Sequence, residues 1–400
     1  MKRSKAVIAI VIAVLLVSPS LSSAAPKKIS LQTGSIFPAP IGTESFLQSG
    51  TNSLFLSNSE SRTADITIKA IDITGASAWE RVIDSGSDEI ASTFGLDSAG
   101  NIWVAGNSAP LLAIETTTPI VGVDNPDGVS IEDVNDVRAD LNQLTVWKLS
   151  STGELQATYI NAMVAVPVIT AISATASGVS IVGTMESAPF IINLSNTGTF
   201  SKVIAFGTTK TVINSVARQS DGSSFLFGSS AETLGGKKVA GKRDGVLIKI
   251  SKSGAISSVV RSSANGAVRS WNSGNQANLL SGHVIAGKVT EVAITKFNNS
   301  FAPTWTARFQ GTGASIAVTG GNNSYLAFTT RSAIPGVNLW KPTSPSLLLL
   351  TFDGKGLLKA AHAFPGLVTP INLQFTRERG VIGLASSSDG AISIFTLVSR

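Results

Sequence analysis

The sequence predicts an all-β chain that is built from repeated four-stranded units closed into a ring. Three observations predict it: a short turn unit recurs along the chain, alternating apolar and polar runs flank each copy, and the last repeat stops one strand short. The composition agrees with this fold class. The chain has 37 glycines and 14% charged residues in 400, which suits many short strands joined by tight turns better than a helical bundle.

Each turn unit places a hydrophobic residue before three turn-forming residues and a glycine. Copies begin at Ile71, Leu149, Leu194, Ile250 and Phe352, and a variant without the glycine begins at Phe297. Glycine at the last position permits the positive φ angle that tight hairpin turns need. A second unit, a turn followed by a short apolar strand, precedes the first, as at 100–106 and 222–228. Each repeat therefore carries about four strands.

Four-stranded repeats of this kind are typical of β-propeller blades. The sequence predicts a seven-bladed β-propeller with blades at 41–85, 86–162, 163–207, 208–262, 263–310, 311–366 and 367–400. The last blade lacks its outermost strand, and we expect the segment 27–34, with an extended run at 28–33, to complete it. An N-terminal strand would then close the ring and remove exposed sheet edges. A β-helix or β-sandwich array is the alternative, and neither explains the incomplete last unit.

Residues 1–25 have the layout of a secretory signal peptide. Lys2, Arg3 and Lys5 precede an apolar run at 6–17, and small residues lead to a cleavage site after Ala24 or Ala25. The alternative is a retained anchor, but the run is short for a spanning helix of about 20 residues. Residues 26–400 are then a single propeller domain without a transmembrane helix, either secreted or held at the cell surface.

The charge balance changes once this segment is removed. The 31 Lys and Arg fall to 28 against 25 Asp and Glu, so the formal net charge falls from +6 to +3. This small excess gives no support for a nucleic-acid partner, which usually meets a clustered basic face. The absence of Cys excludes disulfides, zinc fingers and Cys nucleophiles.

Two stretches resemble a known group of proteins. Residues 97–106 (DSAGNIWVAG) and 244–250 (DGVLIKI) with the following Ser-Gly turn are similar to bacterial secreted β-propeller repeat proteins. The resemblance covers most of the mature chain and is specific in the second and fourth blades. It implies a propeller fold and an extracytoplasmic setting. That group has no single activity, so no catalytic residue is carried over.

Three long loops predict the functional face. The loops between second and third strands are long at 107–142, 229–244 and 331–344, and short at 185–188 and 288–291. All of them lie on one face of a propeller, and long irregular loops in compact domains are more often functional than neutral. The candidate ligand-binding residues are Trp340, Lys341, Lys237, Lys238, Lys242, Arg243 and Trp271.

Each candidate also has a structural interpretation. The basic residues at 237–243 could form an ordinary solvated turn, and Trp340 could pack under its own loop. Four acidic residues in the first long loop could bind a structural calcium ion, but they lack EF-hand spacing, and a solvated acidic loop is the favoured alternative: Asp124, Asp127, Glu132 and Asp133. Otherwise no cofactor is expected. Trp79 and Trp305, which are equivalent in their repeats, are expected to pack between blades.

The titratable residues favour binding over catalysis. The chain has only two histidines, His283 and His362, and the predicted first strands that line the channel offer three scattered carboxylates, Glu44, Glu89 and Glu378. This is a poor acid–base or metal constellation. We therefore expect a monomeric, non-catalytic propeller that binds an extracellular protein or glycan through its long-loop face. A channel-centred lyase or hydrolase and a structural envelope component are the alternatives.

Overall fold

The computed structural model describes residues 28–60, 63–111 and 138–397. Within these ranges every regular element is a β-strand, from β1 to β30. No helix in the described ranges is long and apolar enough to cross a membrane. The predicted signal peptide and the four candidate calcium ligands at 124–133 lie outside the described residues.

The strands form six sheets of four strands and one sheet of six. The first three sheets in chain order consist of β3 (Ser45–Ser49), β4 (Asn52–Glu60), β5 (Ala64–Ile71) and β6 (Ser77–Ile83); of β7 (Glu89–Leu96), β8 (Ile102–Ser108), β9 (Gln143–Leu149) and β10 (Leu155–Ala162); and of β11 (Val168–Thr175), β12 (Gly178–Met185), β13 (Ala188–Ser195) and β14 (Ile204–Ala205).

The next two sheets consist of β15 (Thr211–Arg218), β16 (Ser224–Ser230), β17 (Asp244–Ile250) and β18 (Ile256–Ser262), and of β19 (Val268–Gly274), β20 (Leu279–Ala286), β21 (Val289–Phe297) and β22 (Pro303–Gln310). The six-stranded sheet combines β23 (Ser315–Gly320), β24 (Asn323–Thr330), β26 (Ser346–Phe352) and β27 (Leu358–Phe364) with β1 (Ile29–Thr33) and β25 (Val337–Asn338). The last sheet holds β28 (Leu367–Thr376), β29 (Gly380–Ser387), β30 (Ile392–Thr396) and β2 (Ser35–Pro38).

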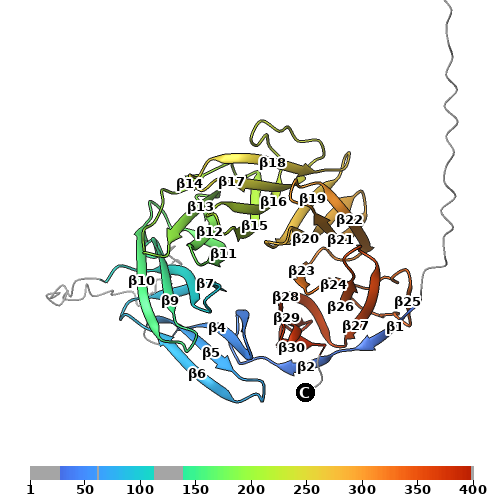
Figure 1. Cartoon of the computed structure of the whole chain (residues 1–400), viewed down its shortest axis with the longest axis horizontal. Coiled ribbons are helices and arrows are strands. Elements are labelled where there is room, and N and C mark those ends of the chain that lie inside the picture. The colour runs from blue at the N-terminus through green and yellow to red at the C-terminus, as the bar shows by residue number, and fades with distance from the viewer. Residues whose placement is uncertain (1–27, 61–62, 112–137, 398–400) are drawn as a thin grey trace, which may run out of the picture.

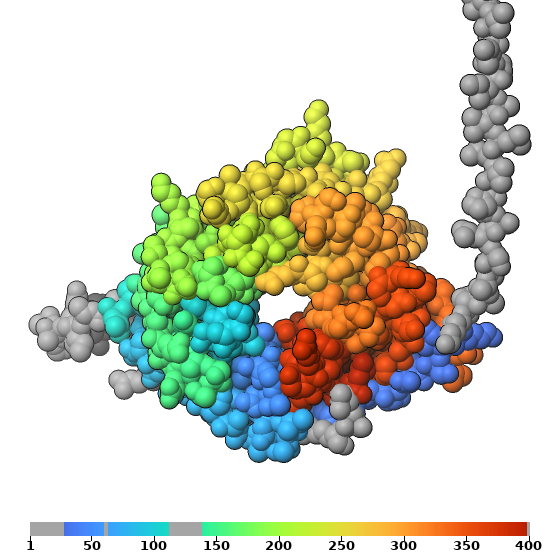
Figure 2. All heavy atoms as spheres, viewed as in Figure 1, coloured from blue at the N-terminus to red at the C-terminus, as the bar shows by residue number. Residues whose placement is uncertain are grey.

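The sheets stand side by side around a central channel, which is the arrangement of a β-propeller (Figure 1). The first strands of neighbouring sheets contact one another in the order β3, β7, β11, β15, β19, β23 and β28, and β28 contacts β3 again. Figure 2 shows the opening that these strands surround. The all-β propeller expectation is therefore confirmed, although six sheets rather than seven have four strands.

The burial of each strand explains its pattern of apolar and polar residues. β8 is buried at every position, because neighbouring sheets cover both of its faces, and its sequence IWVAGNS has no alternation. The outer strand β22 alternates between exposed and half-buried residues, because one of its faces meets solvent. Apolar residues of adjacent sheets merge into shared clusters, so the core lies between the sheets.

The predicted packing of Trp79 and Trp305 between blades is confirmed. A Cβ built on Gly153, in a turn of the next sheet, would lie 2.5 Å from the ring of Trp79. The same construction on Gly356 would lie 2.6 Å from the ring of Trp305. Both glycines also have positive φ angles, 82° and 81°. The repeated glycine therefore serves two needs, the turn conformation and the close approach of an aromatic ring from the preceding sheet.

The closing strand differs from the one expected. Residues 28–33 do not complete the C-terminal sheet: β1 runs parallel to β27 and β25 in the six-stranded sheet. The following segment, β2, pairs antiparallel with β30 and fills the outer position of the last sheet. The physical reason is that two short extended runs stand on either side of Gly34, and the second has the apolar pair Ile36 and Phe37. The N-terminal region thus joins two neighbouring sheets instead of one.

Candidate functional site

The long loops lie where the sequence places them, between second and third strands. The structure describes the whole loop between β16 and β17 and the whole loop between β24 and β26, which includes β25. Of the loop between β8 and β9 it describes only residues 109–111 and 138–142. The candidate calcium ligands fall in the part that is not described, so the calcium expectation stays a prediction.

The loop between β16 and β17 is braced by buried groups. Asp244, which has no exposed surface, accepts hydrogen bonds from the backbone N–H groups of Ala240 and Gly241 at 2.9 Å. Its carboxylate also pairs with Arg261 at 3.3 Å. Arg261 donates in turn to the carbonyl oxygen of Lys237 at 3.1 Å and to that of Glu232. These contacts hold the loop backbone in one conformation.

The lysines of this braced loop point away from it. Lys237, Lys238 and Lys242 are exposed, and none of them forms an ion pair with a described residue. Arg243 is half-buried and donates to the carbonyl oxygen of Lys210, itself an exposed lysine, at 2.9 Å. The structure therefore brings the predicted basic residues together on the loop between β16 and β17, whose backbone is held in one conformation.

Trp340 is not an exposed stacking surface. It is only 5% exposed, it belongs to a cluster with residues of β24 and β26, and its indole N–H donates to the carbonyl oxygen of Ser332 at 2.9 Å. The indole is buried because the loop folds back over it and supplies that acceptor. Trp340 thus packs under its own loop, as the structural alternative describes, and it offers no exposed ring for a ligand. The neighbouring Lys341 is exposed.

Trp271, another candidate ligand-binding residue, is also buried. It is 1% exposed, and its ring contacts Phe297 edge to face at 6.0 Å between ring centroids. The Arg269 guanidinium lies over the same ring, 4.6 Å from its centroid. Trp271 therefore supports a neighbouring charged side chain and is not itself free to bind a ligand.

The channel carries neutral side chains. The hollow at its centre encloses about 580 Å³ and is lined by first-strand residues and the turns after them, such as Thr93, Ile172, Gln276, Asn372 and Gln374. Two of the three carboxylates expected there, Glu44 and Glu378, are exposed at opposite ends of first strands. The third, Glu89, lies at the beginning of β7 and is buried. The structure does not gather these three groups.

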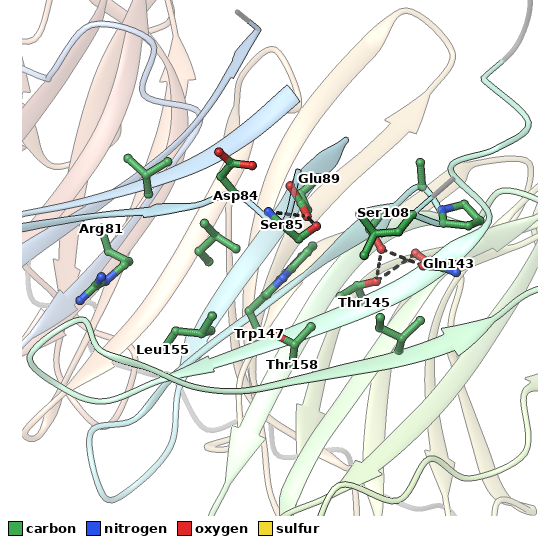
Figure 3. A pocket seen from close by; sticks show the side chains of 16 residues that line it. Arg81, Asp84, Ser85, Glu89, Ser108, Gln143, Thr145, Trp147, Leu155 and Thr158 are labelled. Carbon is green, nitrogen blue, oxygen red and sulfur yellow. Dashed lines mark hydrogen bonds between the residues drawn. The ribbon is translucent and has the colours of Figure 1, made fainter. Parts of the chain in front are cut away.

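Glu89 instead faces a pocket between the β3–β6 and β7–β10 sheets (Figure 3). The pocket encloses about 460 Å³, and Ser85, Ser108, Thr145 and Trp147 line it with Glu89. The backbone N–H of Ser85 donates to Glu89 Oε1 at 3.2 Å, and the Ser85 hydroxyl contacts the same oxygen. Glu89 Oε2 is buried without a hydrogen-bond partner among the described residues. Burial raises the pKa of this carboxyl group above its ordinary value.

Two further carboxylates lie beside Glu89. Carboxylate oxygens of Asp65, Asp84 and Glu89 are all within 4.8 Å of one another. This cluster was missed by sequence reasoning, although the repeat holds a signal for it. Six residues before the start of three turn units the chain has an acidic residue: Asp65, Asp244 and Glu291. Eleven residues after the start of the second and third of these units it has an arginine, Arg261 and Arg308 respectively. The first unit has Val82 at that position, so Asp65 lacks the arginine that pairs with its counterparts.

Comparisons with known proteins show the fold. No family model matches the chain, and no curated protein matches it. Among solved structures, the β-propeller domain of Cps50 (Swd1) from Myceliophteria thermophila is 10% identical over 94% of this chain and 100% of that chain, with a TM-score of 0.51. The β-propeller domain of the trilobed protease from Pyrococcus furiosus is 9% identical over 90% and 95%, with a TM-score of 0.49.

Proposed function

We propose that this chain is a non-catalytic binding module that attaches a protein or glycan partner with acidic groups to its long-loop face. The observation that carries the proposal is the braced loop of residues 231–243. Its exposed lysines have no acidic partner among the described residues, and its backbone is already fixed by Asp244 and Arg261. Binding to a loop that is already ordered costs little conformational entropy, and complementary charge favours encounter.

The neutral channel supports a binding function over channel-centred chemistry. Its described lining offers amides, hydroxyls and apolar groups, such as Gln276, Thr93 and Ile172, and no paired acid and base. General acid–base catalysis needs titratable groups within hydrogen-bond reach of a substrate. A propeller fold is also compatible with many functions, so the proposal depends on the loop and not on the fold.

The proposal includes the number of blades and the compartment. We propose seven blades, counting the six-stranded sheet as one blade to which β1 and β25 are added. We also propose that the segment up to Ala24 or Ala25 is removed on export. The exported protein would then begin at Ala25 or Pro26, which N-terminal sequencing or intact mass measures. An experimental map with six blades, or an exported chain that retains Met1, would contradict these points.

The binding proposal is tested by neutralising the loop. The variant Lys237→Gln/Lys238→Gln/Lys242→Gln should bind immobilised heparin, an anionic glycan probe, and polyglutamate, an acidic polypeptide probe, roughly tenfold more weakly than the wild type. The reason is that each exposed ion pair contributes about 0.2–1 kcal/mol. Titrations at low and high salt measure the loss, which should be largest at low salt.

The control variant carries the same change of net charge on the opposite face. Lys252, Lys355 and Lys359 are exposed in or beside the turns that join third and fourth strands, so replacing all three by Gln leaves the long-loop face intact. The control should bind both probes as the wild type does. Equal weakening by the two triple variants would mean that only net charge matters, and the loop proposal would then be wrong.

A further inference from the structure

A second pocket lies between the β15–β18 and β19–β22 sheets. It encloses about 500 Å³, within the usual size range of small-molecule sites, and three arginines line it: Arg261 from β18, Arg269 from β19 and Arg308 from β22. Its position is equivalent to that of the Glu89 pocket. The pairing registers place Arg269 and Glu89 at the same point of their first strands.

Arg269 is the group in this pocket that the fold does not satisfy. Arg269 is only 6% exposed, and its buried Nε atom has no hydrogen-bond partner among the described residues. It forms no ion pair with them either. Its guanidinium lies over the face of the Trp271 ring. Burying an arginine without a partner is costly, so a partner from outside the chain is the natural complement.

The other two arginines leave one positive charge uncompensated. Arg261 pairs with Asp244 at 3.3 Å, and Arg308 pairs with Glu291 at 3.7 Å. Each of these pairs is neutral, so the excess charge of the pocket is that of Arg269. Burial and the nearby Arg308 lower the pKa of Arg269 to about 10, which still leaves it charged at neutral pH. The pocket therefore suits one negative charge and not two.

The remaining walls are largely apolar. Val260, Phe297, Phe301 and Pro303 line the pocket together with the hydroxyl groups of Thr295 and Thr306. Phe301 is unusual because it has a φ of 59° at the turn position that is glycine in the other turn units. Its ring contacts Phe225 edge to face at 5.0 Å between ring centroids. A large side chain thus occupies a position that favours glycine, and it extends the apolar wall.

We propose that this pocket binds a small organic carboxylate with an apolar body, with the carboxylate on Arg269 and the body against Phe297 and Phe301. A carboxylate supplies the single charge that the pocket lacks, and it matches the planar fork of a guanidinium with two parallel hydrogen bonds. The proposal does not depend on the braced loop, since none of the loop lysines lines this pocket.

Benzoate is the probe, with benzamide as its neutral counterpart and sulfate as a dianion of different shape. In a carboxylate-free buffer, benzoate at millimolar concentration should raise the Tm of the wild type, and benzamide and sulfate should not. Calorimetric titration should give a Kd for benzoate that rises at least tenfold in Arg269→Lys, which keeps the charge but loses the fork. The benzoate effect should vanish in Arg269→Met.

Two observations separate a ligand role from a structural one. Without benzoate, Arg269→Met should be at least as stable as the wild type, because it removes an unpaired buried charge. Phe301→Gly should fold and weaken benzoate binding, whereas Arg377→Met, at an exposed arginine, should bind as the wild type does. The proposal is overturned if benzoate fails to stabilise the wild type, if benzamide or sulfate stabilises it equally, or if Arg269→Met keeps the benzoate effect.

Discussion

At the scale of single residues, Glu89 and Arg269 show how one strand position can carry opposite charges. Both side chains lie at the same point of a first strand, and each faces a pocket between neighbouring sheets. In the β15–β18 sheet the equivalent residue is Thr211, which donates to Glu232 at 2.6 Å. The propeller therefore tolerates acid, base and hydroxyl at this point, so the two buried charges are not requirements of the fold.

The buried carboxyl of Glu89 gives stability an unusual pH dependence. Because its pKa is raised in the folded state, ionisation opposes folding, and this destabilisation grows as pH rises from below the unfolded value, about 4.3, through the folded one. Glu89→Gln should therefore raise the Tm at pH 7 by about 1–2 °C, the shift that about 1 kcal/mol gives in a chain of 400 residues. The gain should shrink towards pH 4.

Thermal unfolding of wild type and Glu89→Gln between pH 4 and 7 measures this difference. The amide can still accept from Ser85, and its N–H₂ group can donate to the nearby Asp65 or Asp84. Glu80→Gln is a suitable control, since Glu80 is half-exposed in a surface pair with Lys69. A pH-independent difference between wild type and Glu89→Gln would contradict the assignment of a raised pKa.

Residue positions could be predicted from the sequence only where the repeat constrains them. Trp79 and Trp305 occupy equivalent repeat positions, and their packing between blades follows from that equivalence. Trp340 and Trp271 lie outside the shared pattern. Whether an indole on a loop is buried depends on how that loop folds back, and Ser332, the acceptor for Trp340, carries no sequence signal of this role.

At the scale of elements, Gly34 separates two strands that belong to different sheets. Its N–H donates to the carbonyl oxygen of Ala363 at 3.0 Å, so the chain is still attached to β27 as it leaves β1. A Cβ built on Gly34 would lie 2.1 Å from Cε1 of Phe364, which is fully buried. The chain can therefore pass from the β1 sheet to the β2 sheet at this point because glycine has no side chain. Sequence reasoning could identify an extended N-terminal run but not that a glycine divides it.

Gly34→Ala should destabilise the protein by about 1–3 kcal/mol, the usual cost of forcing extra atoms into a packed core. Chemical denaturation gives the free energy of unfolding for comparison with the wild type. Gly354→Ala is the control, because a Cβ there meets its nearest atom at 3.8 Å. A Gly34→Ala variant as stable as this control would mean that Phe364 moves aside freely.

At the scale of the whole molecule, the ring is closed by pairs between strands from opposite ends of the chain. The register places Ser35 of β2 opposite Thr396 of β30. Closure of some kind could be predicted from the sequence, because the last repeat lacks a strand. The parallel β1–β27 pair could not, since parallel pairing over three residues leaves no periodicity of its own.

A disulfide across this closure should stabilise the ring strongly. The chain has no cysteine of its own, so Ser35→Cys/Thr396→Cys introduces one defined pair. Closing a loop of more than 100 residues is expected to contribute up to about 5 kcal/mol by restricting the unfolded chain. Oxidised and reduced forms of the same variant are compared by thermal unfolding. Equal Tm values for the two forms would show that opening of this seam does not accompany unfolding.

The double attachment of the N-terminal region also has a consequence for biosynthesis. β1 and β2 emerge from the ribosome first, but their partners β27 and β30 are among the last strands to be made. At a synthesis rate of about 5–20 residues per second, the two early strands wait roughly 20–70 s for those partners. During that interval their backbone groups are open to wrong pairing. The ring can therefore close only after β27 and β30 have been made, so closure is a late step of folding.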